Sequence, residues 1–249
     1  QYLKIVEVTN VVNQAPVIVL PGSHILALGS STSFPVTVTD ADGDPVTTNL
    51  LSGPAGSTFT GGLFSWTALP TNFVNSTNLV VFTADDQQGA TNSVATNSAT
   101  IVVPFDFDGD GLGDAWEIGH YGTLSNGPAG DTDSDGFNNN AEYVAGTQPT
   151  NLNSLFRVQA VSPSANPTTR VVTVGTEPGR RYRIFFTDAG YSNTSAWSAF
   201  ANTNNGVGTW LETNTAASTR QFADDETTNT TLGAPAQGQR SYRVTVESP

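Results

Sequence analysis

The sequence of 249 residues contains no cysteine and no methionine. The absence of cysteine excludes a disulfide framework, thiol chemistry and cysteine-based metal centres. Only two histidines are present, and neither belongs to an HExxH or related metal pattern, so nucleophile-plus-base catalysis has little to work with. We therefore predict that the protein is not an enzyme. Because no methionine is present, we expect the chain to be a processed form or a fragment, with a signal peptide removed.

Positive charge is missing from most of the chain. Between Ile5 and Phe156 there is no Lys or Arg, whereas 15 of the 22 acidic residues lie there. Carboxylates clustered without cationic partners repel one another, and a bound cation relieves this repulsion. The formal net charge of -13 argues against nucleic acid and anionic membranes as partners. No apolar run approaches the length of a membrane span.

Two twelve-residue stretches match the calcium-loop pattern D-x-[DN]-x-[DN]-G-x5-E. They are DFDGDGLGDAWE at 106–117 and DTDSDGFNNNAE at 131–142. In this pattern positions 1, 3, 5 and 12 supply carboxylates, position 7 a backbone carbonyl and position 9 a ligand through water. The predicted ligands of two calcium ions are Asp106, Asp108, Asp110, Leu112, Asp114 and Glu117, and Asp131, Asp133, Asp135, Phe137, Asn139 and Glu142. Two full matches disfavour the plainer interpretation, an Asp/Gly-rich surface turn.

Short strand patterns separated by turn residues predict a β-sandwich over residues 13–104. The stretch SFPVTVTD alternates, which places Phe34, Val36 and Val38 on one face. Further strands are expected at VIVL, HILAL, GLFSW, NLVVFTA and ATIVV. The expected core consists of Phe34, Phe64, Trp66, Val81, Phe82 and Ile101.

Three turn segments of this sandwich carry a family resemblance. NQAPV at 13–17, VTDADGDPVT at 38–47 and FTADDQQGAT at 82–91 resemble the cadherin-like and immunoglobulin-like repeats of large secreted bacterial proteins. Acidic turns of that family often carry calcium, which implies a third ion at Asp40, Asp42, Asp44 and Asp85. Pro45 follows Asp44 here and Leu51 stands at position 12, so a plain solvated turn is an equal alternative.

Residues 105–152 form a small calcium-binding segment between the expected sandwiches. After each loop comes an amphipathic stretch, DAWEIGHYG or NNAEYVAGT, that predicts a helix of about two turns. A strand-like VVPF replaces the entering helix of an EF-hand. The segment resembles dockerin-like and thrombospondin type-3-like calcium repeats. Since it has few apolar groups, ion binding is expected to supply much of its folding energy.

Residues 153–249 return to strand patterns. RRYRIFFTD and RSYRVTVE alternate, and FRVQAV, TRVVTV, the Trp197 segment and VGTWLET complete a second expected sandwich. This region resembles the fibronectin-like terminal domain of secreted bacterial proteins. The expected fold class is mainly β, with two β-sandwich domains joined by a small calcium-binding loop-helix segment.

The first twelve residues, QYLKIVEVTNVV, read as a strand outside the first sandwich. Such a strand can extend a sheet of its own chain, insert into a neighbouring subunit by strand addition, or be a remnant of cleavage. The favoured role is an extracellular or cell-surface structural protein that self-associates into a filament or surface layer. The alternative is an adhesin or a non-catalytic accessory region that binds glycans or cell-surface components through Trp197 or Trp210.

Overall fold

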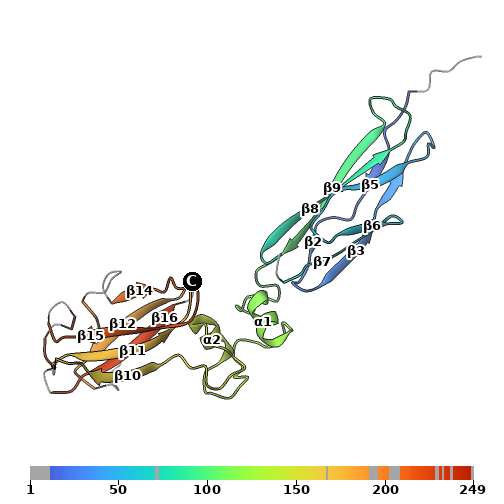
Figure 1. Ribbon diagram of the computed structural model, residues 1–249. Coiled ribbons are helices and arrows are strands. Elements are labelled where there is room, and N and C mark those ends of the chain that lie inside the picture. The colour runs from blue at the N-terminus through green and yellow to red at the C-terminus, as the bar shows by residue number, and fades with distance from the viewer. Residues whose placement is uncertain are drawn as a thin grey trace, which may run out of the picture. The chain divides into compact units, whose positions relative to one another are not determined.

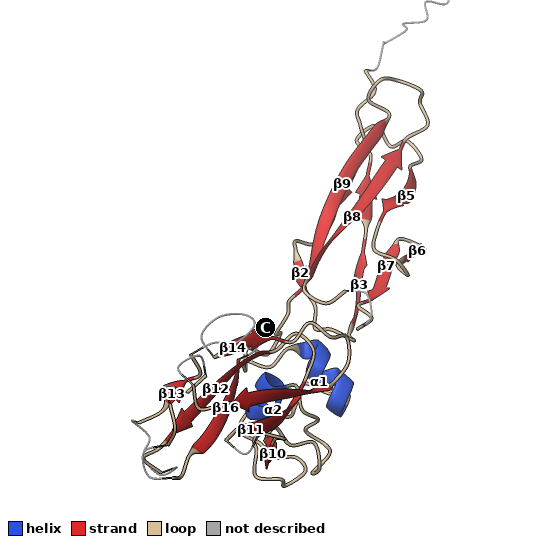
Figure 2. Ribbon diagram, turned by 60° about the vertical axis from the view of Figure 1, so that its left-hand side comes forward, coloured by secondary structure: helices blue, strands red, loops and turns tan. Residues whose placement is uncertain are grey.

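The computed structural model describes residues 12–70, 73–166, 168–190, 196–201, 208–227, 230–231, 233–235 and 238–247. The expected N-terminal strand at 1–12 therefore lies outside the described residues, apart from Val12. The chain divides into two compact units, the first made of Gln1–Gly109 and Gly113–Leu124 and the second of Asp110–Leu112 and Ser125–Pro249. Both units consist mainly of strands, as expected (Figures 1 and 2).

The first unit is an antiparallel sandwich with one parallel edge. One sheet has the strand order β2-β9-β8-β5, a second has the order β3-β7-β6, and β1 pairs with β4. The strand β2 runs parallel to β9. The strands are β1 (Val17–Val19), β2 (His24–Ile25), β3 (Ser31–Pro35), β4 (Thr37–Thr39), β5 (Thr47–Ser52), β6 (Thr58–Thr60), β7 (Leu63–Thr67), β8 (Ser76–Asp85) and β9 (Val94–Val103).

Aromatic side chains from both sheets fill the first core. The Phe34 and Phe64 rings stack with centroids 4.8 Å apart, and Phe82 meets Phe64 edge-on at 5.9 Å. The expected core residues are buried with one exception, because Val81 is only half buried and Val80 takes its place. Successive side chains of a strand point to opposite faces, so the face of Phe82 is shared by Val80 and not by Val81.

The alternating stretch around Phe34 forms two strands instead of one. Phe34 and Val36 are buried and Val38 is half buried, so the expected face is confirmed. The backbone, however, changes partner at Val36, where β3 pairs with β7 and β4 pairs with β1. At this junction the N–H of Val36 donates to the carbonyl of Gly62 at 2.8 Å.

Two short helices follow the two aspartate-rich loops, as expected. Helix α1 (Asp114–Tyr121) packs Ala115 and Ile118 against the core of the first unit. Helix α2 (Asn139–Ala145) belongs to the second unit, and the Asn138 side chain caps it by accepting from the Ala141 N–H at 2.8 Å. The loop-helix segment at 105–152 is thus shared between the two units.

The second unit is also built from two sheets around an aromatic core. One sheet has the order β10-β11-β15; in the other β12 pairs with β13, β14 and β16. The alternation expected for β12 is confirmed, since Tyr182, Ile184 and Phe186 are buried and Arg181 is exposed. The strands are β10 (Val158–Pro163), β11 (Arg170–Thr176), β12 (Arg181–Thr187), β13 (Ser198–Ala199), β14 (Thr209–Leu211), β15 (Ser218–Asp224) and β16 (Ser241–Glu247).

Trp210 belongs to this second core. Its ring stacks on Tyr182 with centroids 5.1 Å apart and contacts Phe222 at 4.2 Å, and the residue is 5% exposed. The sequence-based suggestion that Trp210 presents a glycan-binding surface is therefore wrong, because a ring inside the core cannot stack on a sugar. Trp197 is partly exposed, with the guanidinium of Arg243 4.7 Å from its ring centroid.

Adjacent valines of β8 give a direct test of the strand register. Val80→Ala should lower the free energy of unfolding by about 2 kcal/mol, because two buried methyl groups are lost and a cavity remains. Val81→Ala removes the same atoms from a half-buried position and should cost less than half as much. Denaturant unfolding of both variants measures the difference, and equal losses would contradict the assignment of faces.

Candidate metal centre

The first aspartate-rich loop brings its carboxylates together between β9 and α1. Asp106, Asp108 and Asp114 each offer an oxygen within 4.8 Å of the others, and Asp108, Asp110 and Glu117 form a second such group. Asp114 is fully buried. Its Oδ1 accepts from the Phe107 N–H at 2.8 Å, whereas its buried Oδ2 has no hydrogen-bond partner among the described residues. Leaving a charged oxygen unsatisfied in this way is costly unless a cation compensates it.

The second loop shows the same arrangement within the second unit. Asp131, Asp133 and Asp135 place oxygens within 4.8 Å of one another. Their Oδ1 atoms accept backbone N–H groups of the loop itself, at 2.8 Å from Ser134, 3.2 Å from Asp135 and 2.7 Å from Phe137. The Oδ2 atoms of Asp133 and Asp135 are buried and have no donor in the described part of the chain. In Asp133 and Asp135 one oxygen thus shapes the loop and the other is available to a cation, whereas both oxygens of Asp131 accept loop N–H groups, Oδ2 from Gly136 at 3.1 Å.

Glu142, at position 12 of the second loop, is buried beside these aspartates. It is 1% exposed, one carboxylate oxygen meets only the Thr147 hydroxyl at 3.5 Å, and Oε2 has no hydrogen-bond partner in the described residues. Burial, followed by the negative charges of Asp133 and Asp135, raises the pKa of Glu142 to about 7. A bound divalent cation would lower the pKa of Glu142 again, because its positive charge favours the ionised carboxylate.

Glu212, in the same unit, is a buried carboxylate whose hydrogen-bond partner is a cationic side chain of the chain itself. It is also 1% exposed, but Arg220 donates to it from Nε and Nη2 at 3.0 Å each, and the Thr176 hydroxyl donates at 2.8 Å. The Arg220 hydrogen bonds lower the pKa of Glu212 to about 2. Residue type and burial match those of Glu142, so the difference lies in the absence of an internal cation at the second loop.

Both loops share one backbone pattern. Gly111 and Gly136, at position 6, have φ values of +97° and +94°, the left-handed region in which a side chain is strained. Position 4 is left-handed as well, at Gly109 and Ser134. These positive φ values explain why the loop pattern requires glycine at position 6.

Positions 7 and 9 show where the structure places the remaining predicted ligands. The N–H groups of Leu112 and Phe137 each donate to the position-5 carboxylate, at 2.9 and 2.7 Å, so these residues occupy equivalent places. Asn139 does not point a free amide at the loop. Its Oδ1 accepts from the Thr132 hydroxyl at 3.0 Å and its Nδ2 donates to the Gly127 carbonyl at 2.9 Å. The asparagine therefore fastens the preceding turn, a role that its spacing alone did not indicate.

The acidic turn of the first unit is a weaker candidate. Asp40, Asp42 and Asp44 place oxygens within 4.8 Å of one another. Asp42 is exposed, Asp40 and Asp44 are half buried, and Oδ2 of Asp40 is buried without a hydrogen-bond partner among the described residues. Burial, together with the charges of Asp40 and Asp42, raises the pKa of Asp44. Asp85 does not join this group and accepts from the Gln87 N–H at 2.8 Å.

Asp86, rather than Asp85, is the buried aspartate at this end of the first unit. It is 1% exposed, and its carboxylate accepts from the Asn13 amide at 2.9 Å and from the Gln88 N–H at 2.9 Å. Sequence reasoning did not select it, because two neighbouring aspartates cannot be told apart without the strand register. Its contact with Asn13 shows that the NQAPV segment is fastened to the acidic turns.

Comparisons with known proteins classify the first unit. Residues 13–103 match the family model of a bacterial Ig domain, which bears out the immunoglobulin-like resemblance of this region. No curated protein is significantly similar to the chain in sequence. The resemblances of the remaining residues to dockerin-like, thrombospondin type-3-like and fibronectin-like domains stay predictions.

Similarity to solved structures is limited. An endo-fucoidan hydrolase, MfFcnA4 of glycoside hydrolase family 107, is 19% identical over 39% of this chain, which spans 14% of that protein, with a TM-score of 0.28. The SrpA adhesin of Streptococcus sanguinis is 13% identical over 67% of this chain and 88% of its own, with a TM-score of 0.29. Titin domains Z1Z2 in complex with telethonin give 10% identity over 85% and 95% of the chains and a TM-score of 0.25. Scores this low carry no functional argument. No helix among the described residues is long and apolar enough to cross a membrane.

The Glu212–Arg220 pair predicts how stability depends on pH. Because the folded pKa of Glu212 is about 2, below its ordinary value of 4.5, its contribution is complete above about pH 5 and is lost as the pH falls toward 2. Glu212→Gln should therefore be less stable than the natural chain near neutral pH, and the difference should shrink toward pH 2. Urea unfolding at a series of pH values measures it, with exposed Glu247→Gln as control. A difference that stays constant from about pH 6 to 2 would contradict the assignment.

Proposed function

We propose that this chain is a calcium-stabilised structural module of a secreted or cell-surface protein, with one ion in each aspartate-rich loop. The observation that carries the proposal is the convergence of buried carboxylate oxygens that lack donors, above all those of Asp133, Asp135 and Glu142. The bacterial Ig domain at 13–103 supports an extracellular setting, where calcium is present at roughly millimolar concentration. We assign the chain no catalytic role.

The chemistry of the donors favours calcium over other metals. Each loop offers carboxylate oxygens and backbone carbonyls and contains no histidine or cysteine, which excludes the softer ligands that zinc and copper prefer. Calcium accepts six to eight oxygens in flexible geometry, whereas magnesium demands near-ideal octahedral coordination and retains water. A loop with four carboxylates at positions 1, 3, 5 and 12 therefore suits calcium best.

Packing of the helices supports a structural role for the ions. Helix α1 contributes Ala115 and Ile118 to the first core, so ordering the first loop also fixes apolar contacts of that unit. In the second unit, Arg180 donates to the Tyr143 carbonyl of α2 at 2.8 Å, which fastens the second loop to the β-sheet region. Ions bound in the folded state alone would stabilise both units by mass action.

A neutralising substitution gives the sharpest test of ion binding. Asp133→Asn keeps the size of the side chain and removes one charge. With chelator, it should leave the melting temperature unchanged or raise it, because carboxylate repulsion falls. In millimolar calcium it should lower the melting temperature relative to the natural chain, because a ligand charge is lost.

Thermal melts with calcium and with chelator measure both effects, and exposed Glu247→Gln serves as the matched control. Chelation should lower the melting temperature of the natural chain and make residues 105–152 accessible to protease. Identical melting curves in calcium and chelator would refute the structural role of the ions.

The second part of the proposal is self-association into a filament or surface layer through residues 1–12. Its support is the sequence of that segment, which reads as an apolar strand outside the bacterial Ig domain. Removing residues 1–11 should convert the assembly into monomers in calcium, as measured by light scattering coupled to size-exclusion chromatography. An unchanged oligomer size would contradict strand addition.

A further inference from the structure

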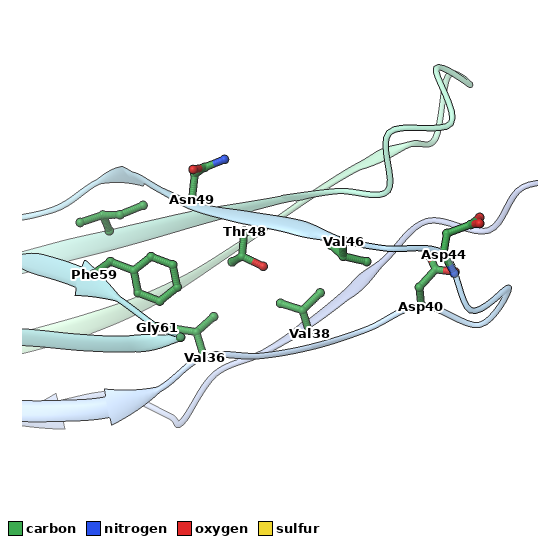
Figure 3. Close-up of a pocket in the computed structure, with 11 residues that line it drawn as sticks. Val36, Val38, Asp40, Asp44, Val46, Thr48, Asn49, Phe59 and Gly61 are labelled. Atoms are coloured by element: carbon green, nitrogen blue, oxygen red, sulfur yellow. The ribbon is translucent and has the colours of Figure 1, made fainter.

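An open groove runs along the first unit next to its acidic turn (Figure 3). Its volume is about 780 Å³. Val38, Val46, Leu50 and Phe59 line it and remain half buried although they pack against the core. Asp40 and Asp44 lie at one end, and the turn at Gly61 lies toward the other (Figure 3). Apolar side chains and the polar Thr48 and Asn49 thus share the lining of the groove, and its mouth is negatively charged.

Backbone edges flank this groove. Among the described residues β4 pairs only with β1, and β5 pairs only with β8, so each has one edge without a partner strand. The β6–β7 hairpin covers the edge of the continuous β3–β4 segment only as far as Val36, whose N–H donates to the carbonyl of Gly62. Val38 lies two residues further along. Because a strand repeats every two residues, Val38 faces the same side as Val36. An extended chain placed there would continue the antiparallel sheet beyond the hairpin.

The N-terminal segment has the pattern that such a groove accepts. In an extended conformation Lys4, Val6 and Val8 share one face. With both valines against the apolar side chains of the groove, the ammonium of Lys4 falls at the mouth beside Asp40 and Asp44. Lys4 is the single lysine of the chain and the last cation before Arg157, so this is the one cation of the N-terminal half that can meet the acidic turn.

The length and direction of the segment fit as well. An added strand that runs antiparallel to β4 passes from the acidic mouth toward Phe59. Residues 4 to 8 then span about 13 Å, within the roughly 17 Å of a six-residue strand such as β5. The charged and apolar ends of the segment therefore match the charged and apolar ends of the groove in a single register.

Connectivity favours a second molecule over the same chain for this register. The N–H of Gln14 donates to the Asp42 carboxylate at 2.7 Å, which anchors the start of the Ig domain at the acidic end. A strand that continues straight back from Gln14 would run from the mouth inward and place Lys4, ten residues earlier, up to about 33 Å from the mouth. To meet the acidic turn of its own chain, Lys4 would need a reversal within residues 9–13 that covers the roughly 13 Å back to the mouth, whereas a second molecule reaches the same register without one. The pairing of Lys4 with the acidic turn therefore favours a second molecule.

We propose that the groove between β4 and β5 is the acceptor site for residues 2–8 of a second copy of this chain. The inference rests on the self-association part of the proposed function and specifies its interface. Donor segment and acceptor groove are different surfaces, so the contact is heterologous and propagates from subunit to subunit, into an open chain or a closed ring.

Engineered disulfides test the register, because the natural chain has no cysteine to interfere. Lys4→Cys combined with Asp44→Cys should give a ladder of covalent multimers on a non-reducing gel. The matched control combines Lys4→Cys with Ser98→Cys, an exposed position of β9 outside the groove, and should give no ladder. Equal ladders from both pairs, or only an intrachain cross-link, would overturn the proposal.

A peptide experiment tests the charge pairing without requiring assembly. A synthetic peptide of residues 1–12 should bind the chain that lacks residues 1–11, as measured by fluorescence anisotropy. Lys4→Glu in the peptide should weaken binding at least about tenfold by placing like charges together. Asp44→Lys in the acceptor should restore binding of that variant peptide but not of the natural one. Equal affinity of both peptides for the natural acceptor would overturn the proposal.

These readouts are independent of the calcium test. Absence of peptide binding together with a chelator-sensitive melt would remove the groove and leave the calcium proposal standing. Multimers that form without the Lys4–Asp44 cross-link would show assembly through another surface and would also overturn the groove assignment.

Discussion

Within each of the two aspartate-rich loops, groups of three carboxylates place oxygens within 4.8 Å of one another. No lysine or arginine lies between Ile5 and Phe156 in the sequence to offset their charge. This repulsion acts on a segment that also shapes the packing of both units, because α1 contributes to the first core and α2 is fastened to the second unit. Asp133 and Asp135 each use one oxygen to accept a backbone N–H of the second loop, and bury the other without a donor among the described residues. We propose that an external cation stabilises this folded form.

In the β-sheet region of the second unit, buried carboxylates are compensated by arginine side chains of the same region. Glu212 is held by Arg220, and Asp224, 1% exposed, accepts from Arg240 at 3.0 Å and from the Tyr242 hydroxyl at 2.8 Å. Buried charge is thus compensated by arginine in the C-terminal region and has no such partner at the two loops. This division explains why the arginines lie on one side of the sequence and the clustered aspartates on the other.

Residue patterns predicted the fold class and most strands, and the misses have physical causes. Strong alternation located β12 and β16, whereas β5, β6 and β15 were not predicted because TTNLLS, TFT and STRQFAD carry few apolar residues in period. The choice of Val81 over Val80 failed because two adjacent valines satisfy either face until Phe82 and the pairing of β8 decide it. Trp210 was offered as a surface residue because composition alone cannot distinguish an aromatic ring in the core from one at the surface.

Features that depend on near neighbours in the chain could be predicted from the sequence. The order of aspartates and glycines within each twelve-residue loop dictates the left-handed turns at Gly111 and Gly136 and the clustering of carboxylates, since every partner lies within a few residues. Tertiary structure was needed to identify Asp86 as the buried aspartate near NQAPV and to show the groove between β4 and β5, because both depend on strands distant in sequence whose pairing is set by the packing of whole sheets. The role of Asn139 also needed the structure, because its amide donates to the carbonyl of Gly127 in a preceding turn.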